Sequence, residues 1–331
     1  MISMRKKTDF IKQGQITDVP GIKVGNREDK DALTGCTVIL AEEGATAGVD
    51  VRGSAPGTRE TDLLNPINFV EKVHAIVLSG GSAFGLDAAS GVMHYLEEQD
   101  VGLPVGPVKV PIVPAAVLFD LAVGNGKIRP DKQMGYEAAR TASSQPFKVG
   151  NVGAGCGATV GKLAGFEKSM KGGLGSASIR LENDVTIGAI VAVNPVGDVR
   201  NPATGEILAG PYDRHQRRLI NSLDILEYQS TIEVSAGSNT TIGVIAINAD
   251  LTKAEATKVA QMAHDGYART IYPAHTMLDG DTIFTMATGG HKVSVDLLGT
   301  MAAKAMELAI LNAIYSAESA ANIPAYRDLF K

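Results

Sequence analysis

Short apolar runs alternate with amphipathic segments along the chain, a pattern typical of a domain that mixes strands with helices. Apolar runs that end at glycine or turn residues predict strands, and they lie at residues 36–41, 75–78, 185–193, 241–248 and 282–286. Apolar positions three and four residues apart predict helices over residues 86–98 and Val295–Ser316. A capping box at Thr252 and Glu255 begins a third helix, which we expect to end near Thr270.

The order of these elements favours a layered α/β sandwich over a doubly wound sheet, because strands and helices do not alternate strictly. Residues 104–114, which are rich in proline, and residues 124–132 are expected to be connections. One face of Val295–Ser316 is nearly free of charge, so we expect a core or interface helix there. No linker separates two domains in the sequence, and we predict one domain over residues 1–331.

Composition narrows the class of protein without indicating its chemistry. The chain has 331 residues, of which 44% are hydrophobic, and its net charge of −5 gives no basic excess for binding nucleic acid. Its two cysteines, Cys36 and Cys156, are too few for a disulfide framework and indicate a reducing compartment. We find neither the apolar core of a secretory signal nor an apolar segment that reaches the roughly 20 residues needed to span a bilayer. We therefore expect a cytoplasmic protein.

The turn before the fourth predicted strand carries the first candidate chemistry. A small, turn-prone Gly237-Ser238-Asn239 is followed directly by Thr240 and Thr241. If the Thr240 hydroxyl attacks the Asn239 carbonyl, cleavage leaves Thr240 as a new N-terminus whose α-amine activates its own hydroxyl. From these residues alone, a plain asparagine-containing turn that enters a core strand is the favoured explanation of the pattern.

Two glycine-rich segments match known motifs only in part. Ser82 lies between a predicted strand and a predicted helix, but a nucleophilic serine of the Gly-x-Ser-x-Gly type needs its second glycine one residue before Gly85. We expect a tight turn there whose backbone N–H groups face a cleft. The segment ending at Lys162 lacks two residues of a phosphate loop, since Cys156 and Leu163 replace the required glycine and Ser/Thr. ATP binding is not expected, and Lys162 alone is equally well explained as a surface lysine.

A pair of carboxylates, Asp279 and Asp281, flanks Gly280 immediately before the last predicted strand. The glycine allows a sharp turn, and two close carboxylates split their titrations, so that one stays charged and orients a hydroxyl or an ammonium. An α-ammonium at Thr240 needs such a partner. The residues alone leave two alternatives open, a solvated Asp-Gly hairpin turn and a metal site completed by His275.

Taken together, these segments resemble a known family in sequence order, over nearly the whole chain from about residue 16 to residue 316. The matching blocks are residues 51–62, 78–86, 153–162, 192–195, 239–243 and 279–282. They resemble the N-terminal-nucleophile amidases, which include the L-aminopeptidase/D-Ala-esterases, the β-peptidyl aminopeptidases and the 6-aminohexanoate-oligomer (nylon-oligomer) endohydrolases. The Asn-Thr pair and the Asp-Gly-Asp triplet are similar to the nylon-oligomer branch, because the aminopeptidase branch has Ser at the cleavage point and Ser-Gly-Asp before the late strand.

The resemblance implies a four-layer αββα sandwich and self-cleavage between Asn239 and Thr240, which divides the chain into an α chain (1–239) and a β chain (240–331). It implies an amidase that hydrolyses small oligoamides or peptides through an acyl-enzyme at Thr240, most like a 6-aminohexanoate-oligomer endohydrolase. It implies no metal and no organic cofactor, and a homo-oligomer of processed αβ units. An exo-acting aminopeptidase and an uncleaved binding protein of the same fold remain alternatives.

Matching positions give each site residue an implied role. Thr240 is the nucleophile, and Asp279 and Asp281 hold its amine and its hydroxyl. Lys162 resembles the basic residue that keeps the nucleophile poised. Asn194 resembles the amide that stabilises the oxyanion.

Two further residues are candidates for contact with substrate, Ser82 and Phe119. Other members of the family carry tyrosine at the position of Phe119. If that phenol binds the substrate carbonyl, this chain lacks the donor, and Asn194 and backbone groups carry more of the developing charge.

Overall fold

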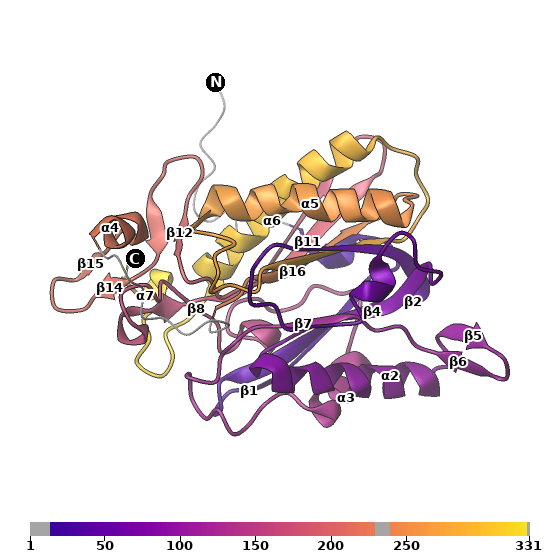
Figure 1. Cartoon of the computed structure of the whole chain (residues 1–331), viewed down its shortest axis with the longest axis horizontal. Coiled ribbons are helices and arrows are strands. Elements are labelled where there is room, and N and C mark those ends of the chain that lie inside the picture. Colours follow the sequence, from indigo (N-terminus) through magenta and orange to yellow (C-terminus); the bar gives the residue numbers. More distant parts are fainter. Residues whose placement is uncertain (1–13, 229–238, 330–331) are drawn as a thin grey trace.

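The computed structural model of the chain describes residues 14–228 and 239–329, and Figure 1 shows their arrangement. Gly237 and Ser238, the first part of the predicted cleavage turn, lie outside these residues. A nine-stranded sheet has the order β10-β11-β16-β18-β2-β4-β7-β3, with β1 paired to β2. Its members are β1 (Lys23–Asp29), β2 (Thr34–Val51), β3 (Thr58–Arg59), β4 (Lys72–Ser79), β7 (Ala115–Val117), β10 (Gly173–Arg180), β11 (Thr186–Val193), β16 (Ile242–Ile247) and β18 (Thr282–Ala287).

The remaining strands form small sheets at the periphery. They are β5 (Leu103–Val105) with β6 (Val108–Val110), β8 (Thr159–Val160) with β9 (Met170–Lys171), β14 (Tyr212–Asp213) with β15 (Arg218–Leu219), and β12 (Asp198–Arg200) between β13 (Ile207–Ala209) and β17 (Ile271–Tyr272). The α-helices are α2 (Ala88–Glu98), α3 (Lys132–Arg140), α4 (Ser222–Tyr228), α5 (Lys253–Thr270), α6 (Val295–Ser316) and α7 (Tyr326–Leu329).

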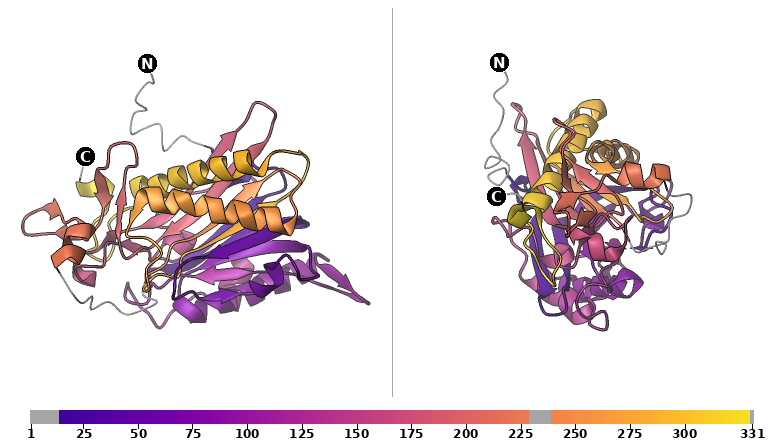
Figure 2. Two further views of the ribbon diagram at one scale, coloured as in Figure 1. Left: turned by 45° about the horizontal axis from the view of Figure 1, so that its top comes forward. Right: turned by 90° about the vertical axis from the view of Figure 1, so that its left-hand side faces the viewer.

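The long strand β2 links two halves of the nine-stranded sheet. Its residues 46–51 pair with β18, whereas its residues 36–46 pair with β4, and the register shifts between Leu40 and Ala45. Helices α5 and α6 cover the half that contains β10, β11, β16 and β18 (Figures 1 and 2). Helices α2 and α3 cover the half that contains β1 and β4.

Three apolar cores fill the spaces between successive layers. The core beneath α5 and α6 contains Ile245, Tyr267 and Met306. The core between the two halves of the sheet contains Ile76, Ile190 and Phe284. The core beneath α2 and α3 contains Val77, Val92 and Ala138. Neighbouring residues of a strand face opposite layers, so Ile76 and Val77 of β4 belong to different cores. The predicted four-layer αββα sandwich is therefore confirmed, with the two halves of the sheet as its inner layers.

Most of the predicted elements are present, and the differences have physical reasons. The five predicted strands correspond to β2, β4, β11, β16 and β18, and the three predicted helices correspond to α2, α5 and α6. The connection expected over residues 104–114 instead contains part of the hairpin β5–β6. Helix α3 begins where the second expected loop ends, with the Asp131 side chain accepting from the Met134 N–H as its N-cap.

The strand β10 was not predicted, because the small residues that form much of it make no apolar run. Where it crosses α6 there is no room for a side chain at Gly175, since a Cβ there would overlap the Ala309 carbonyl. The uncharged Val295–Ser316 is a core helix as predicted: it packs on α5, β10 and β11. Within the described residues it is also the one helix long and apolar enough to cross a membrane, contrary to the expectation from sequence, but 78% of that apolar window is buried in the fold.

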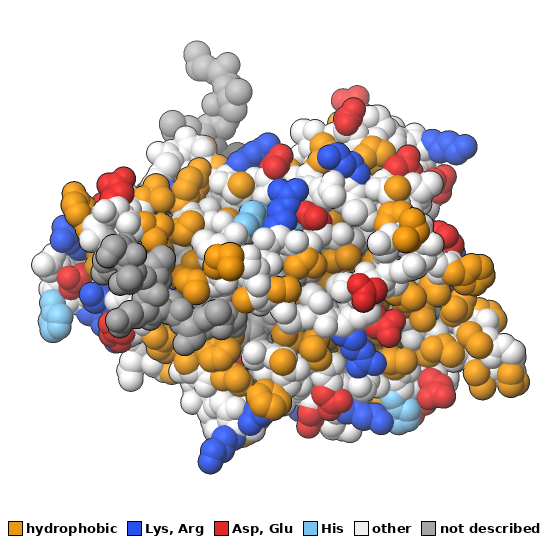
Figure 3. Space-filling view, in the orientation of Figure 1, with side chains coloured by type: hydrophobic (Ala, Val, Ile, Leu, Met, Phe, Trp, Pro, Cys, Tyr) orange, Lys and Arg blue, Asp and Glu red, His pale blue; other side chains and the backbone are white. Residues whose placement is uncertain are grey.

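The surface seen in Figure 3 mixes charges of both signs. Lysine and arginine side chains lie close to aspartate and glutamate side chains on that face, without separating into regions of one sign. This mixture agrees with a chain whose 31 basic residues nearly balance its 36 acidic residues.

Candidate active site

The starts of β16 and β18 lie side by side, because these strands are parallel neighbours with Ile242 opposite Thr282. The segments that precede them therefore meet at one end of the sheet. The N–H of Thr282 donates to the Thr241 carbonyl at 3.1 Å, and the N–H of Gly280 donates to Thr240 Oγ1 at 3.1 Å. The fold thus joins the threonine and the Asp-Gly-Asp triplet, which are 40 residues apart in sequence.

Thr240 is buried, with 2% of its surface exposed. Its N–H donates to the Asn194 carbonyl at 3.0 Å, and its Oγ1 contacts the carbonyl oxygen of Asn239. The approach of Gly280 requires glycine, because a Cβ there would lie 2.8 Å from Thr240 Oγ1 and 2.7 Å from the Ala55 carbonyl oxygen. The Thr240 hydroxyl is therefore held against the carbonyl that self-cleavage would attack.

Asn194 and Lys162 lie beside Thr240. Asn194 follows β11, the antiparallel neighbour of β16, and both Asn194 and Lys162 are buried. The explanation of Lys162 as a surface lysine is therefore wrong. Lys162 Nζ lies 2.7 Å from the Thr159 carbonyl, 3.1 Å from the Asn194 carbonyl and 3.2 Å from Asn194 Oδ1. The Asn194 carbonyl consequently accepts from both the Thr240 N–H and the lysine.

Burial sets the protonation of this lysine. Removal from water lowers the pKa of the Lys162 ammonium to about 7, the negative charge of Asp279 offsets part of this effect, and the positive charge of Lys171 adds to it. Near neutral pH, Lys162 is therefore divided between its ammonium and amine forms. A group titrating in that range exchanges protons readily with a neighbouring reacting group.

The buried Lys162 should make stability depend on pH above neutrality. An unfolded lysine titrates near pH 10.4 and the folded one near 7, so between these values the unfolded chain binds more protons and the free energy of unfolding rises with pH. We expect Lys162→Met to reduce this rise by about 1.4 kcal/mol per pH unit. Urea unfolding from about pH 7.5 to about pH 9.5 measures it, in a Thr240→Ala background that removes the hydroxyl expected to cut the chain. Equal pH dependence in the two proteins would contradict the burial of a titrating lysine.

Both polar atoms of the Asn194 side chain form hydrogen bonds in the intact chain. Its Oδ1 accepts from the Thr159 N–H at 2.8 Å, and its Nδ2 donates to the Phe119 carbonyl at 3.2 Å. Phe119 is half-buried and reaches the site through this carbonyl. Thr159, which holds both Asn194 and Lys162, was not predicted as a site residue, because a threonine three residues before a lysine carries no chemical signal.

Both carboxylates of the Asp-Gly-Asp triplet are buried, so the solvated hairpin turn is wrong. Asp281 Oδ1 accepts from the Thr241 N–H at 2.7 Å, and its Oδ2 accepts from the backbone N–H of His275 at 3.0 Å and pairs with His275 Nδ1 at 2.9 Å. Asp279 Oδ2 accepts from the Thr276 hydroxyl at 2.6 Å. Burial and then the charge of Asp281 raise the pKa of Asp279 to about 6.

Within the part of the chain that the structure describes, neither carboxylate bonds to Thr240 itself: Asp281 holds the backbone directly after it, and Asp279 holds Val196 and Thr276. Among the described residues, Thr240 bonds with Asn194, Asn239 and Gly280, whereas Asp281 holds the following N–H. In the intact chain Thr240 has an amide nitrogen and no α-ammonium. The positive charge that the pair is predicted to hold therefore arises only on cleavage.

Ser82 makes none of these contacts. The N–H of Ser82 donates to the Leu118 carbonyl at 2.9 Å, and the N–H of Gly81 donates to Asp120 Oδ1 at 2.7 Å. Both N–H groups are used within the protein, so the expectation that they face a cleft is wrong. The turn instead packs on the segment that contains Phe119, and its place in substrate binding remains a prediction.

The alternative metal site does not assemble in the part of the chain that the structure describes. No group of three His, Cys, Asp or Glu side chains there is arranged to hold a metal ion. His275 pairs with Asp281, while Asp279 is held by Thr276.

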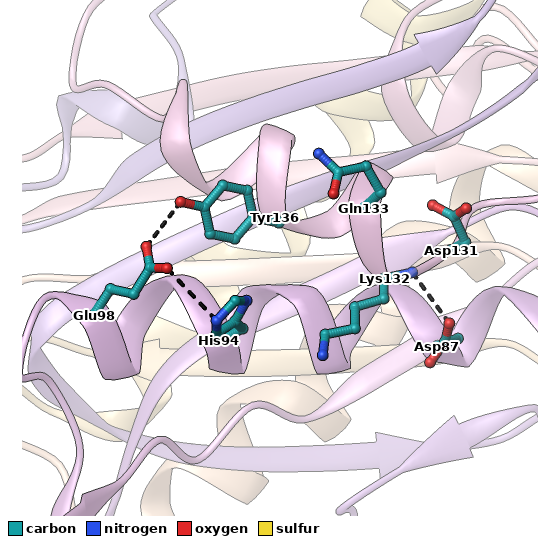
Figure 4. Close-up of a pocket in the computed structure, with 7 residues that line it drawn as sticks. All are labelled: Asp87, His94, Glu98, Asp131, Lys132, Gln133 and Tyr136. Atoms are coloured by element: carbon teal, nitrogen blue, oxygen red, sulfur yellow. Dashed lines mark hydrogen bonds and ion pairs between the residues drawn. The ribbon is translucent and has the colours of Figure 1, made fainter.

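A cavity of about 520 Å³ lies elsewhere, between α2 and α3 (Figure 4). It is lined by Asp87, His94, Glu98, Asp131, Lys132, Gln133 and Tyr136. Glu98 accepts from the Tyr136 hydroxyl at 2.8 Å and pairs with His94 at 3.5 Å, so these polar groups satisfy one another. None of them belongs to the cluster around Thr240, and the cavity lies in the helical layer on the other side of the sandwich from α5 and α6.

Comparison with known proteins assigns the chain to a family. The family described as Peptidase family S58 matches residues 14–325 of this chain. The chain belongs to peptidase family S58. An uncharacterized aminopeptidase of Mycobacterium tuberculosis is 43% identical to this S58 chain over an alignment of 343 positions, gaps included, that covers 95% of this chain and 97% of the relative. A 6-aminohexanoate-oligomer endohydrolase of Kocuria sp. is 33% identical over 314 residues, covering 89% of this chain and 84% of that enzyme.

A solved structure shows the fold of the S58 chain. The L-aminopeptidase D-Ala-esterase/amidase of Ochrobactrum anthropi, described as a variant of the Ntn hydrolase fold, matches with a TM-score of 0.67 at 18% identity. The match covers 92% of this chain and 86% of that one. The four layers are thus those of an N-terminal-nucleophile hydrolase fold, as the sequence resemblance implied. Family and fold together make the S58 chain a hydrolase of the peptidase and amidase type.

Proposed function

We propose that this chain is a self-processing threonine amidase that cleaves its own Asn239–Thr240 bond and then uses Thr240 as its nucleophile. One observation supports this most directly: the buried Thr240 hydroxyl contacts the Asn239 carbonyl and accepts a hydrogen bond from the Gly280 N–H. Asn194 and Lys162 are joined to the backbone of Thr240, because the Asn194 carbonyl accepts from both the Thr240 N–H and Lys162 Nζ.

Self-cleavage would proceed by acyl transfer. The Thr240 Oγ1–C bond to Asn239 forms, the C–N bond between the two residues breaks, and the hydroxyl proton passes to the departing nitrogen. The resulting ester is hydrolysed by water, which leaves a carboxylate on Asn239 and a free hydroxyl and α-amine on Thr240. The released amine then lies near the carboxylates that already hold the neighbouring backbone.

Turnover of a substrate repeats this chemistry between two molecules. The α-amine of Thr240 takes the hydroxyl proton, Oγ1 attacks the substrate amide carbon, and the leaving amine receives the proton. Water then hydrolyses the acyl-enzyme. Asn194 Nδ2, once released from the Phe119 carbonyl, and Lys162 would donate to the developing oxyanion.

The proposed substrates are small oligoamides or peptides. The Asn-Thr and Asp-Gly-Asp patterns and the relative named a 6-aminohexanoate-oligomer endohydrolase favour internal amide bonds. The relative named an aminopeptidase, at 43% identity, favours exo-action as the second candidate. Hydrolysis of an oligoamide whose amine is acetylated separates the two, because an exo-enzyme requires the free amine.

Denaturing electrophoresis tests the processing step. We expect two bands from the purified protein, and N-terminal sequencing of the smaller band should begin Thr240-Thr241-Ile242. A single intact band without amidase activity would favour an uncleaved binding protein of the same fold. Size-exclusion chromatography of the cleaved material tests the expected homo-oligomer of αβ units.

We expect Asp279→Asn and Asp281→Asn to slow amide hydrolysis by about 10- to 100-fold, because each removes an anion beside the Thr240 α-ammonium. The raised pKa of Asp279, about 6, also predicts loss of activity as the pH falls below that value, because protonation removes its charge. Rates per cleaved chain between about pH 4.5 and about pH 8 measure both effects. Loss of parent activity in EDTA, with recovery on adding a divalent metal, would contradict this account.

A further inference from the structure

We propose that His275 is a positioning residue of the Thr240 site: it fixes Asp281 so that this carboxylate holds the backbone directly after the nucleophile. The inference rests on the proposed threonine nucleophile and adds to it a residue without contact to the reacting atoms.

The two oxygens of Asp281 have separate partners. Oδ2 receives the backbone N–H of His275 at 3.0 Å and pairs with its Nδ1 at 2.9 Å, while Oδ1 receives the Thr241 N–H at 2.7 Å. A carboxylate accepts but does not donate when ionised, so Nδ1 of His275 carries the hydrogen in this pair. With Oδ2 held twice, the plane of the carboxylate is set and Oδ1 is directed at the peptide that follows Thr240.

His275 is itself held in one orientation. Its φ of +58° lies in the left-handed region, which a non-glycine residue keeps only where its surroundings enforce it. Its ring stacks on Tyr267 with centroids 6.0 Å apart and meets the ring of His264 edge-on at 4.8 Å. Both of those residues belong to α5, and both are buried.

The cluster formed by the rings of His264, Tyr267 and His275 also contacts β2. His264 Nε2 lies 3.1 Å from the Asp50 carbonyl oxygen, near the end of β2. Because β2 pairs with β18, the three rings brace the start of β18 against α5 and β2. Packing by itself would explain the rings, but it does not require Nδ1 of His275 to lie 2.9 Å from Asp281 Oδ2.

The charges near Asp281 allow the donor to be tested by pH. The titratable and charged groups around it are His275, His264, Tyr267 and Asp279, with Asp50 and Arg52 beyond His264. Burial lowers the pKa of His264 to about 4, and burial followed by the charge of Asp281 raises that of Tyr267 well above its usual value. A hydrogen-bond donor to a carboxylate favours its ionised form. Removing the Nδ1–H should therefore move the loss of negative charge from the Asp279 and Asp281 carboxylates to higher pH.

Three variants at one position separate the donor from the packing. His275→Asn places an amide N–H near the position of Nδ1 and tolerates a left-handed backbone. His275→Gly keeps that backbone without strain and has no side-chain donor. His275→Gln carries its amide one bond further out. Each full-length protein is followed for its rate of self-cleavage, for kcat and KM per cleaved chain on a soluble amide, and for the pH dependence of kcat.

We expect His275→Asn to retain self-cleavage and the parent pH profile. His275→Gly and His275→Gln should lower kcat by roughly 10- to 100-fold with little change in KM, and their acid limb should move to higher pH. A glycine variant with parent kcat and pH profile would overturn the proposal, as would equal loss in the asparagine and glycine variants. If the glycine variant does not fold, equal rates for the asparagine and glutamine variants would overturn it.

Two controls keep this result distinct from failure of the proposed function. If the parent protein is neither cleaved nor active, the threonine amidase is wrong, whatever the His275 variants do. If EDTA abolishes parent activity and a divalent metal restores it, His275 belongs to a metal site and the positioning role is overturned.

Discussion

Replacing Thr240 with alanine is expected to leave one intact chain without measurable amidase activity. Cleavage and catalysis share the same hydroxyl in the proposed mechanism, and alanine removes it while keeping the backbone that donates to Asn194. Loss of a nucleophile of this kind lowers kcat by about 10⁵-fold or more. Denaturing electrophoresis and an amide hydrolysis assay measure the two effects on the same preparation.

The neighbouring threonine supplies a matched control for this prediction. Thr241 Oγ1 is buried and has no hydrogen-bond partner among the described residues, so Thr241→Val replaces it with a methyl group of similar shape at little cost. We expect Thr241→Val to be cleaved and active, and Thr240→Ser to keep a working hydroxyl. A cut Thr240→Ala chain, or an uncut Thr241→Val chain that still folds, would move the nucleophile to Thr241.

Lys162→Met should lower kcat per cleaved chain by about 100- to 1,000-fold while KM changes little. Methionine fills much of the volume of the lysine but donates nothing to the Asn194 and Thr159 carbonyls, which the ammonium joins at 3.1 and 2.7 Å. The lost interaction acts on charge that develops in the transition state, so substrate affinity is largely preserved. Single-chain and cleaved fractions have to be separated, because slow maturation lowers the apparent rate in the same direction.

The control for this second prediction is Lys148, which is exposed and takes part in none of the contacts described around Thr240. We expect Lys148→Met to retain parent kcat. An unchanged kcat in cleaved Lys162→Met would show that the lysine holds the loop at Thr159 and Asn194 but takes no part in the chemistry.

Local patterns predicted most of the fold because they report burial one element at a time. The strands β11, β16 and β18 are buried on both faces, so nearly every position in them is apolar or small and the sequence shows a continuous apolar run. The strand β10 has the opposite character, since its glycines let it pack closely against α6, and close packing of glycine leaves no hydrophobic pattern in the sequence. Helix α3 was missed because its glycine lies within the helix, where it allows contact with α2.

The residues of the candidate site also fall into those that sequence motifs predicted and those that only the structure revealed. The residues proposed for chemistry, Thr240, Lys162, Asn194, Asp279 and Asp281, were chosen from motifs, and the structure places them all at one end of the sheet. The contacts of Thr159 with Asn194 and Lys162, and of His275 with Asp281, were not predicted. These contacts depend on how the chain folds, and no spacing of residues in the sequence indicates them.

The sequence by itself determined the order of strands and helices, the family, and which residue types are available to react. Only the tertiary structure decided their states: the burial that lowers the pKa of Lys162 to about 7 and raises that of Asp279 to about 6, and the sharing of the Asn194 carbonyl between lysine and threonine. The reason is that reactivity depends on desolvation and on neighbours within a few ångströms. Those neighbours come from chain segments that only the packing of the four layers brings together.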